Sequence, residues 1–333
     1  MNPVLVNVWR GSSIESRHRG AVAVVDVQGR VVFSLGDIQR PEFPRSAIKY
    51  LQAIPLLETG AADHFELTPK HISFACASHN AESIHTDFAE EWLSSIDCTT
   101  DQLECGAELP GDPDAQFKLI ASGGTPRRYH HNCSGKHLGL ITTCKHMNES
   151  LQNYRLYQHP VQQRWFDVLE ALASVKVQQL SWGYDGCGIP TLALPLQRVA
   201  LAQARFADPS ALSSERRSAI ERIIESVAAH PYMVAGKERL CTALMELTGK
   251  SLLVKIGAEG YYTATVPGKG LGIALKIDDG NHRGSQVALG AVLEKMNLLS
   301  AEQSRQLAEY LNPDVTNSRG EVIGRLEPSS EWV

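Results

Sequence analysis

The chain has 333 residues, of which 43% are hydrophobic and 21% are charged, so it is long enough to bury a large core. Its formal net charge is -5, and it has no long run of lysine and arginine, so the sequence carries no electrostatic sign of nucleic-acid binding. Chemistry on a small molecule is the first expectation.

The cellular compartment is predicted from the absence of secretion and membrane-spanning patterns and from the cysteines. The first twenty residues lack the basic, apolar and small-residue pattern of a secretion signal, and no stretch reaches about 18 uninterrupted apolar residues. The seven cysteines are odd in number and irregularly spaced, which favours reduced thiols over a disulfide framework. We therefore expect a cytoplasmic protein.

Short β-branched segments open the chain. They are predicted as strands at residues 4–9, 20–26 and 30–35, with "VQG" turning the last two into a hairpin. After Pro44, apolar residues recur at helical spacing from Ile48 to Leu57. Proline is favoured at the start of a helix, so we expect Ser46 in the first turn.

The middle of the sequence is predicted to be helical and rich in loops. The apolar run 71–78 is interpreted as a strand, and the polar stretch 105–134 as a long loop. Helical patterns occupy about 83–96, 135–145, 160–173, 212–229 and 235–248. Three strands at 251–258, 260–267 and 271–278 follow, then helices at about 283–297 and 301–310, and a polar tail expected on the surface beyond Leu311.

Strands and helices are thus segregated along the chain, which indicates an α+β fold. We expect the strands from both termini to form one antiparallel sheet that packs against a helical lobe. The chain is predicted to be a single catalytic unit of two lobes, with a sheet lobe at about 1–45 and 250–333 and a mainly helical lobe at about 46–249.

The stretch "RSAIK" places Ser46 and Lys49 three residues apart at the expected helix start. Residues at this spacing share a helix face, and the helix N-terminus favours a developing alkoxide. A lysine that burial makes less basic can accept a proton from a serine. The same pair also fits an ordinary solvated helix start, so other motifs have to support it.

Three further motifs contain chemically useful residues. "CASHN" carries Ser78, which either faces a cleft or caps the next helix. "HHNCSGKH" and "WGYDGCGIP" carry Cys133 and Cys187, which are either two soft zinc ligands or small buried thiols. "VKIG" places Lys255 and a glycine on a late strand, as in serine hydrolases that use S-x-x-K.

In this order the motifs resemble the class 3, rhizobial-type L-asparaginases. Long strings such as "RSAIKYLQAIPLLETG", "NCSGKHLG", "WGYDGCGIPTLALPL", "HPYMVAGKERLCTALM" and "LGIALKIDDGN" carry the resemblance from about residue 4 to about 310. The resemblance implies a fold like that of the serine β-lactamases and glutaminases, and a homodimer. The loop at 105–130 and the residues around "KIGAEGYY" depart from the family pattern, so substrate specificity is less firmly implied than the chemistry.

The resemblance also implies roles for individual residues. Ser46 with Lys49 matches a first catalytic pair, and Ser78 with Lys255 a second pair whose members meet only in the fold. The resemblance implies that zinc is bound by Cys133, Lys136 and Cys187. It implies that the substrate is bound by Arg45, His137, Asp185 and Cys241. A lysine that binds a metal must be neutral, so Lys136 needs a depressed pKa.

The expected activity is hydrolysis of the side-chain amide of L-asparagine. Ser46 is expected to attack with Lys49 as proton acceptor, and the alternative has Ser78 attacking with Lys255 as base and Ser46 as relay. Backbone N–H groups near Ser46 are the expected oxyanion donors. The chain is also consistent with a glutaminase, a penicillin-recognising Ser-Lys hydrolase or a non-catalytic protein stabilised by zinc.

Overall fold

The computed structural model describes residues 1–332, which form two compact units. Unit 1 consists of Met1–Ala47, Ala193–Asp208 and the described residues from Val254 onward. Unit 2 consists of Ile48–Leu192 and Pro209–Leu253. Within the described part of the chain, no helix is long and apolar enough to cross a membrane.

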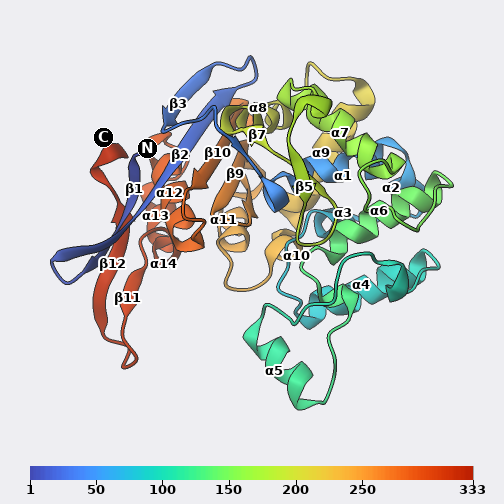
Figure 1. Ribbon diagram of the computed structural model, residues 1–333, viewed down its shortest axis with the longest axis horizontal. Helices are drawn as coiled ribbons and strands as arrows, with labels where there is room; N and C mark the ends of the chain where they lie inside the picture. Colours follow the sequence, from blue (N-terminus) through green and yellow to red (C-terminus); the bar gives the residue numbers. More distant parts are fainter. Residues whose placement is uncertain (333) are drawn as a thin grey trace. The chain divides into compact units, whose positions relative to one another are not determined.

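Unit 1 is built on an antiparallel sheet to which both ends of the chain contribute (Figure 1). Its path is β11 (Asp314–Thr316), β12 (Val322–Pro328), β1 (Val4–Arg10), β2 (Ser13–Asp26), β10 (Leu271–Ile277), β9 (Tyr261–Val266) and β8 (Leu253–Gly257), while β3 (Val31–Leu35) pairs with β2. The α+β prediction, with a sheet made from both termini, is therefore confirmed.

The tail beyond Leu311 was expected on the surface, and no strand was predicted within it. It supplies β12, which pairs with β1, and β11, which pairs with β12. Buried Leu326 lies opposite Val8, and Trp332 Nε1 donates a hydrogen bond to Leu5 O over 2.8 Å. The polar appearance of this segment hid a half-buried strand.

Residues 193–208 belong to unit 1, whereas the sequence placed them in the helical lobe. They form β7 (Leu194–Pro195), which pairs with β4 (Pro41–Glu42), and α8 (Leu196–Ala207), which packs on β2, β9 and β10. Gly272 of β10 permits this contact, since a Cβ there would lie 2.0 Å from Ala200 O. Helices α12 (His282–Lys295), α13 (Ala301–Gln306) and α14 (Ala308–Leu311) complete the unit.

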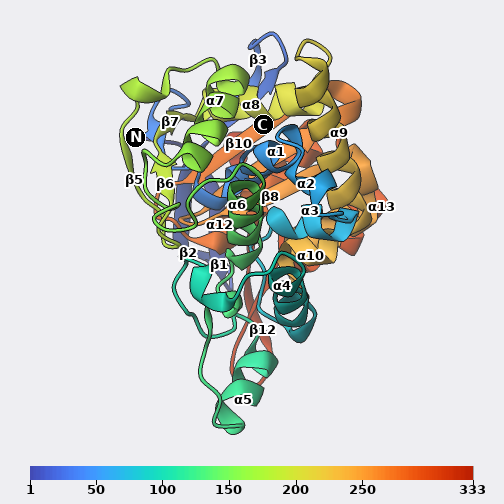
Figure 2. The ribbon, with the colours of Figure 1, turned by 90° about the vertical axis from the view of Figure 1, so that its right-hand side faces the viewer.

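Unit 2 is mainly helical (Figure 2). Helices α1, α3, α6, α7 and α9 pack on one another, and nine of the ten residues of α1 are buried. A small hairpin of β5 (Trp182–Tyr184) and β6 (Pro190–Leu192) belongs to the same unit. The helices are α1 (Lys49–Glu58), α2 (Ala61–His64), α3 (Pro69–Ala75), α4 (Ser83–Ser95), α5 (Pro113–Ala121), α6 (Ser134–His146), α7 (Pro160–Ala173), α9 (Ser214–Ala229), α10 (Pro231–Ala235) and α11 (Leu240–Thr248).

Two segments of unit 2 differ from the prediction. The apolar run 71–78 is not a strand, because Thr68 and Pro69 start helix α3 and His71 Nδ1 accepts the Thr68 N–H over 3.1 Å. The stretch 105–134 contains α5, which Asp112 caps by accepting the Ala115 N–H over 2.8 Å. Helix α5 has no buried residue and lies apart from α1, α3 and α6 in both views (Figures 1 and 2).

Candidate active site

The chain passes from unit 1 to unit 2 between Ser46 and Lys49. Residues Arg45–Ile48 form a 3₁₀ turn, and α1 begins at Lys49, so Ser46 precedes the α-helix that the sequence placed it in. Arg45 has a left-handed backbone with φ of 49°. Such conformations in non-glycine residues are costly and are often found at functional sites.

The Lys49 side chain is fully buried in unit 2 and reaches the end of α3. Its Nζ donates to Ala77 O, to Ser78 Oγ at 2.9 Å and to Cys133 Sγ at 3.1 Å. The sequence analysis paired Lys49 with Ser46 and Ser78 with Lys255, and it missed the contact between Lys49 and Ser78. Only a correct placement of helix α3 could have revealed it.

Hydrogen bonds tie Ser78 to α10 and the next residue, His79, to the start of α6. Ser78 N donates to Val234 O at 2.8 Å, and His79 N donates to Asn132 O at 3.2 Å. The His79 Nδ1 atom accepts the Ala81 N–H, so the proton is on Nε2, which lies 2.8 Å from Ser134 Oγ. Burial lowers the pKa of His79 well below its usual value, which keeps the ring neutral.

The predicted zinc ligands come together within unit 2. Lys136 Nζ donates to Cys187 Sγ over 2.9 Å. The hydrogen bond between the two thiol groups lowers the pKa of Cys133 well below its usual value and raises that of Cys187, and the charges of Lys136 and Lys49 lower the Cys133 value further. The two cysteines, Lys136 and Lys49 thus form one buried cluster in unit 2.

Local backbone geometry places these three residues. Cys133 precedes the first residue of α6, and Lys136 lies in its first turn. Gly135 between them lets α6 approach α3, since a Cβ at this position would lie 2.0 Å from Phe74 O. Cys187 sits in the turn between β5 and β6, where Gly188 has a φ of 88° and donates its N–H to Asp185 O over 2.8 Å.

The donor set fits a soft divalent ion, since it offers two cysteine sulfurs and an amine. Burial opposes the charge of Lys136, but the nearby Cys133, Cys187 and Asp185 raise its pKa above the usual value. Without an ion, Lys136 is therefore protonated. Binding a metal requires this proton to leave, as the resemblance implied for a neutral lysine ligand.

The segment that carries Ser46 and Arg45 lies against β8 and β9 within unit 1. A Cβ at Gly257 of β8 would lie 2.5 Å from Pro44 O, and Thr263 Oγ1 donates to Ala47 O over 2.7 Å. Lys255, two residues before Gly257, is fully buried on the same strand. Ser46 and Lys255 thus belong to unit 1, whereas Lys49 and Ser78 belong to unit 2.

Cys241 and His137 are both buried in unit 2. Cys241 lies on α11. The pKa of Tyr50 is raised mainly by the burial of Tyr50 and next by the charge of Cys241. Because Tyr50 follows Lys49 on α1, Cys241 is near the start of that helix. His137 lies on α6, with its Nδ1 2.5 Å from the Tyr154 hydroxyl.

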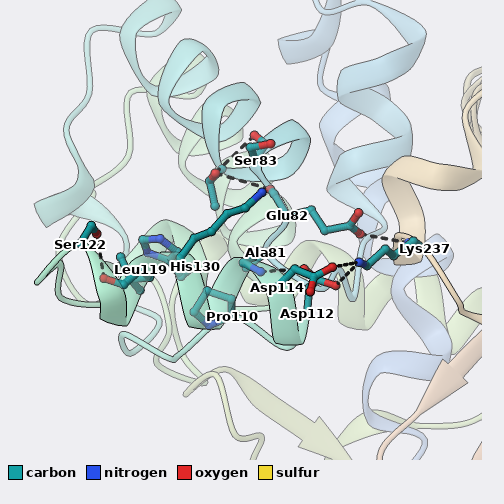
Figure 3. A pocket seen from close by; sticks show the side chains of 13 residues that line it. Ala81, Glu82, Ser83, Pro110, Asp112, Asp114, Leu119, Ser122, His130 and Lys237 are labelled. Carbon is teal, nitrogen blue, oxygen red and sulfur yellow. Dashed lines mark hydrogen bonds and ion pairs between the residues drawn. The ribbon is translucent and has the colours of Figure 1, made fainter.

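A cavity of about 540 Å³ lies beside the Ser78 segment in unit 2. Ala81, Glu82, α5 and Lys237 line it, and Lys237 Nζ reaches Asp112 at 3.0 Å and Asp114 at 2.7 Å (Figure 3). Glu82 accepts the Lys237 N–H over 3.0 Å. Lys237 therefore links α5 and its cap to Glu82 in the wall of the cavity.

Another group with metal-binding side chains comprises Cys144, Glu149 and His159. The Glu149 carboxylate already binds the Arg164 guanidinium through both oxygens, and His159 Nδ1 caps α7 by accepting the Val161 N–H. Arg164 therefore supplies the cation at this position. All seven cysteines are free and buried.

Several solved structures are similar to this chain. A structure titled as a putative β-lactamase from Bacteroides dorei matches with a TM-score of 0.42 and 13% identity, over 78% of this chain and 87% of that one. A structure of Mglu in its native form matches with a TM-score of 0.44 and 14% identity, over 84% of this chain and 64% of that one. A class C β-lactamase from Rhodobacter sphaeroides matches with a TM-score of 0.42 and 13% identity, over 84% of this chain and 95% of that one.

Among curated proteins, no match was found. The family model described as L-asparaginase II matches residues 6–328, which is nearly the whole chain and agrees with the resemblance expected from the motifs. The chain belongs to the L-asparaginase II family.

Proposed function

We propose that this amidohydrolase hydrolyses the side-chain amide of L-asparagine to L-aspartate and ammonia. The observation that carries the proposal is the buried Lys49 side chain, whose Nζ lies 2.9 Å from Ser78 Oγ and 3.1 Å from Cys133 Sγ. Once it has released one proton, a buried lysine beside a serine hydroxyl can accept the serine proton during nucleophilic attack. Family membership supports the amide as the substrate group.

Ser46, three residues before Lys49 in the chain, is the proposed nucleophile. Its oxygen attacks the amide carbon, its proton passes to Lys49 and then to the leaving nitrogen, and ammonia departs. Water then cleaves the resulting ester and releases aspartate. Lys255 is proposed to hold charge beside the Ser46 segment of unit 1.

Ser78 is the alternative nucleophile. Its contact with Lys49 favours it, and Lys49 rather than Lys255 would then be its base. However, Ser78 already donates its backbone N–H to Val234 O, so that N–H is not placed to stabilise an oxyanion. We therefore assign Ser78 to orienting the Lys49 amine and passing protons.

Zinc is proposed to bind to Cys133, Lys136 and Cys187. A bound zinc ion would supply positive charge that orients the α-amino and carboxylate groups of the substrate. Asp185 influences the Lys136 charge, and with Arg45, His137 and Cys241 it is proposed to complete the substrate site. A homodimer in the cytoplasm is the proposed working form.

The decisive experiment measures ammonia release from L-asparagine and from L-glutamine by the purified protein, with bound zinc quantified in the same sample. We expect a higher kcat/KM for asparagine and about one zinc per site. A preference for glutamine would identify a glutaminase, and covalent labelling by a penicillin would identify a penicillin-recognising hydrolase. A protein that is inactive on both amides and unfolds in a chelator would be a non-catalytic protein stabilised by zinc.

The nucleophile can be identified with a diazoketone analogue of asparagine, which alkylates the attacking oxygen. Peptide mass spectrometry is expected to find the label on Ser46. A label on Ser78 would reverse the assignment of the two serines but would leave the amidohydrolase reaction standing. Normal turnover by the Ser46→Ala variant would also exclude Ser46 as the nucleophile.

A further inference from the structure

Tyr154 connects a buried hydrogen-bond network to His137 of α6. Its hydroxyl oxygen accepts the Glu104 N–H over 2.8 Å and lies 2.5 Å from His137 Nδ1. Tyr154 and His137 are both completely buried. Buried polar groups are nearly always hydrogen-bonded, so a donor and an acceptor can be assigned to each bond in this network.

The residues around Tyr154 hold its ring in place. The Glu104 carboxylate accepts the backbone N–H groups of the residues before and after Tyr154, from Asn153 at 2.6 Å and from Arg155 at 3.1 Å. Gln162 of α7 donates to Tyr154 O over 2.8 Å. The phenol is therefore fixed from its backbone and from its hydroxyl, although the segment before α7 is irregular.

This network decides which nitrogen of His137 carries the proton. Because the Tyr154 oxygen accepts the Glu104 N–H, its own O–H can donate to Nδ1, which leaves the proton on Nε2. With a proton on Nδ1, the phenolic O–H would lose this acceptor at a completely buried position. The Nε2–H tautomer is the one that satisfies the network.

The Nε2 atom of His137 has no hydrogen-bond partner among residues 1–332. His137 lies four positions after Cys133, which places the two on one face at the start of α6. The charges of Lys136, Cys133 and Lys49 all act on the His137 ring. The Nε2–H donor therefore lies close to the residues proposed to bind zinc and substrate.

We propose that Tyr154 is a positioning residue that holds His137 in the tautomer with the proton on Nε2, and that this N–H donates to a carboxylate oxygen of the amino-acid substrate. The substrate part rests on the proposed function. The tautomer part does not, because the phenol and the backbone of Glu104 set it without a ligand.

The tautomer is tested by ¹⁵N NMR of the histidine side chains, with the His137 signals assigned from their loss in a His137→Gln variant. We expect the protein to show Nε2–H, and the Tyr154→Phe variant to show a mixture. For that variant, KM for asparagine should rise about tenfold with kcat changed less than about twofold, as for the loss of one buried hydrogen bond. Tyr157→Phe, which removes a hydroxyl from the same segment, should change neither.

A pair of amide substitutions tests the donor separately. His137→Gln places its amide nitrogen near the position of Nε2 and should keep KM within about threefold, whereas His137→Asn places it near Nδ1 and should raise KM about tenfold. The double variant Tyr154→Phe with His137→Gln should match His137→Gln alone, because an amide has no tautomer to set.

An Nδ1–H signal in the unaltered protein would overturn the role of Tyr154. Equal KM values for His137→Gln and His137→Asn would overturn the donation to substrate. If the protein hydrolysed no amide, the proposed function would fail while the NMR result still decided the tautomer, so the two failures are distinguishable. If Tyr154→Phe did not fold, the unaltered protein and the amide pair would still decide both parts.

Discussion

Lys49 Nζ lies 2.9 Å from Ser78 Oγ, although the two residues are 29 positions apart in the chain. The contact forms because α1 begins at Lys49 and α3 ends just before Ser78, and both helices pack on α6. Cys133 at the start of α6 completes the contact by accepting from the same nitrogen. Three helix ends thus meet at one lysine.

Replacing Lys49 with methionine should abolish most of the activity. The substitution keeps a long side chain but removes the group that accepts the serine proton, so kcat for asparagine should fall by about 10² to 10⁴. Ammonia release measures the effect, and circular dichroism shows whether the variant remains folded. Lys145→Met is the matched control, since Lys145 Nζ also binds backbone carbonyls but lies at the other end of α6. Equal losses in the two variants would argue against Lys49 as the proton acceptor.

Zinc binding should depend on Cys133 and Cys187. Serine at either position removes a sulfur ligand, so the zinc content measured by atomic absorption should fall to less than about half of the normal value. KM for asparagine should rise in both variants if the ion orients the substrate. Cys98→Ser removes another buried thiol, at the end of α4, and should leave the zinc content unchanged. Full zinc loading in both site variants would remove these residues as ligands.

The sequence predicted the terminal sheet well because its strands are β-branched and bounded by turn residues, as in β1, β9 and β10. It failed for β12 and α8, whose partners lie far away in the chain. The individual site residues were found through long motifs, but the contact between Lys49 and Ser78 depends on how α1, α3 and α6 pack. No local sequence pattern indicates the role inferred for Tyr154, because this role follows from a hydrogen bond that its hydroxyl accepts from the backbone of Glu104.

Gly257 should be intolerant of a side chain. A Cβ there would lie 2.5 Å from Pro44 O and 3.1 Å from the Ala47 Cβ, so Gly257→Ala has to displace the segment that carries Ser46. We expect a loss of about 1–3 kcal/mol in the free energy of unfolding and a large loss of kcat. Gly268→Ala in the same unit is the control, because nothing lies within 4 Å of its Cβ position. A fully active Gly257→Ala variant would show that Ser46 need not keep this position.

Stability should fall as the pH is lowered from about 7 to 5, and His71 should contribute to the fall. Burial, with a smaller effect of Lys70, lowers the pKa of His71 to about 4, whereas the pKa of an unfolded histidine is about 6.5. Between these values the unfolded chain binds more protons than the folded chain, so the free energy of unfolding decreases as the pH falls. His79 and His85 have lowered pKa values and act in the same direction.

The His71→Gln variant isolates this contribution. Glutamine cannot take up a proton, so the decrease in the free energy of urea unfolding between pH 7 and 5 should be smaller in the variant by about 1 kcal/mol, after allowance for the partial exposure of His71. The substitution also removes ring contacts to Phe88 and Trp92, which lowers stability at every pH. Only the difference between the two pH values within each protein therefore reports the titration. If both proteins lose the same amount, His71 takes up its proton at the same pH in the folded and the unfolded chain, and its burial against Phe88 does not lower its pKa.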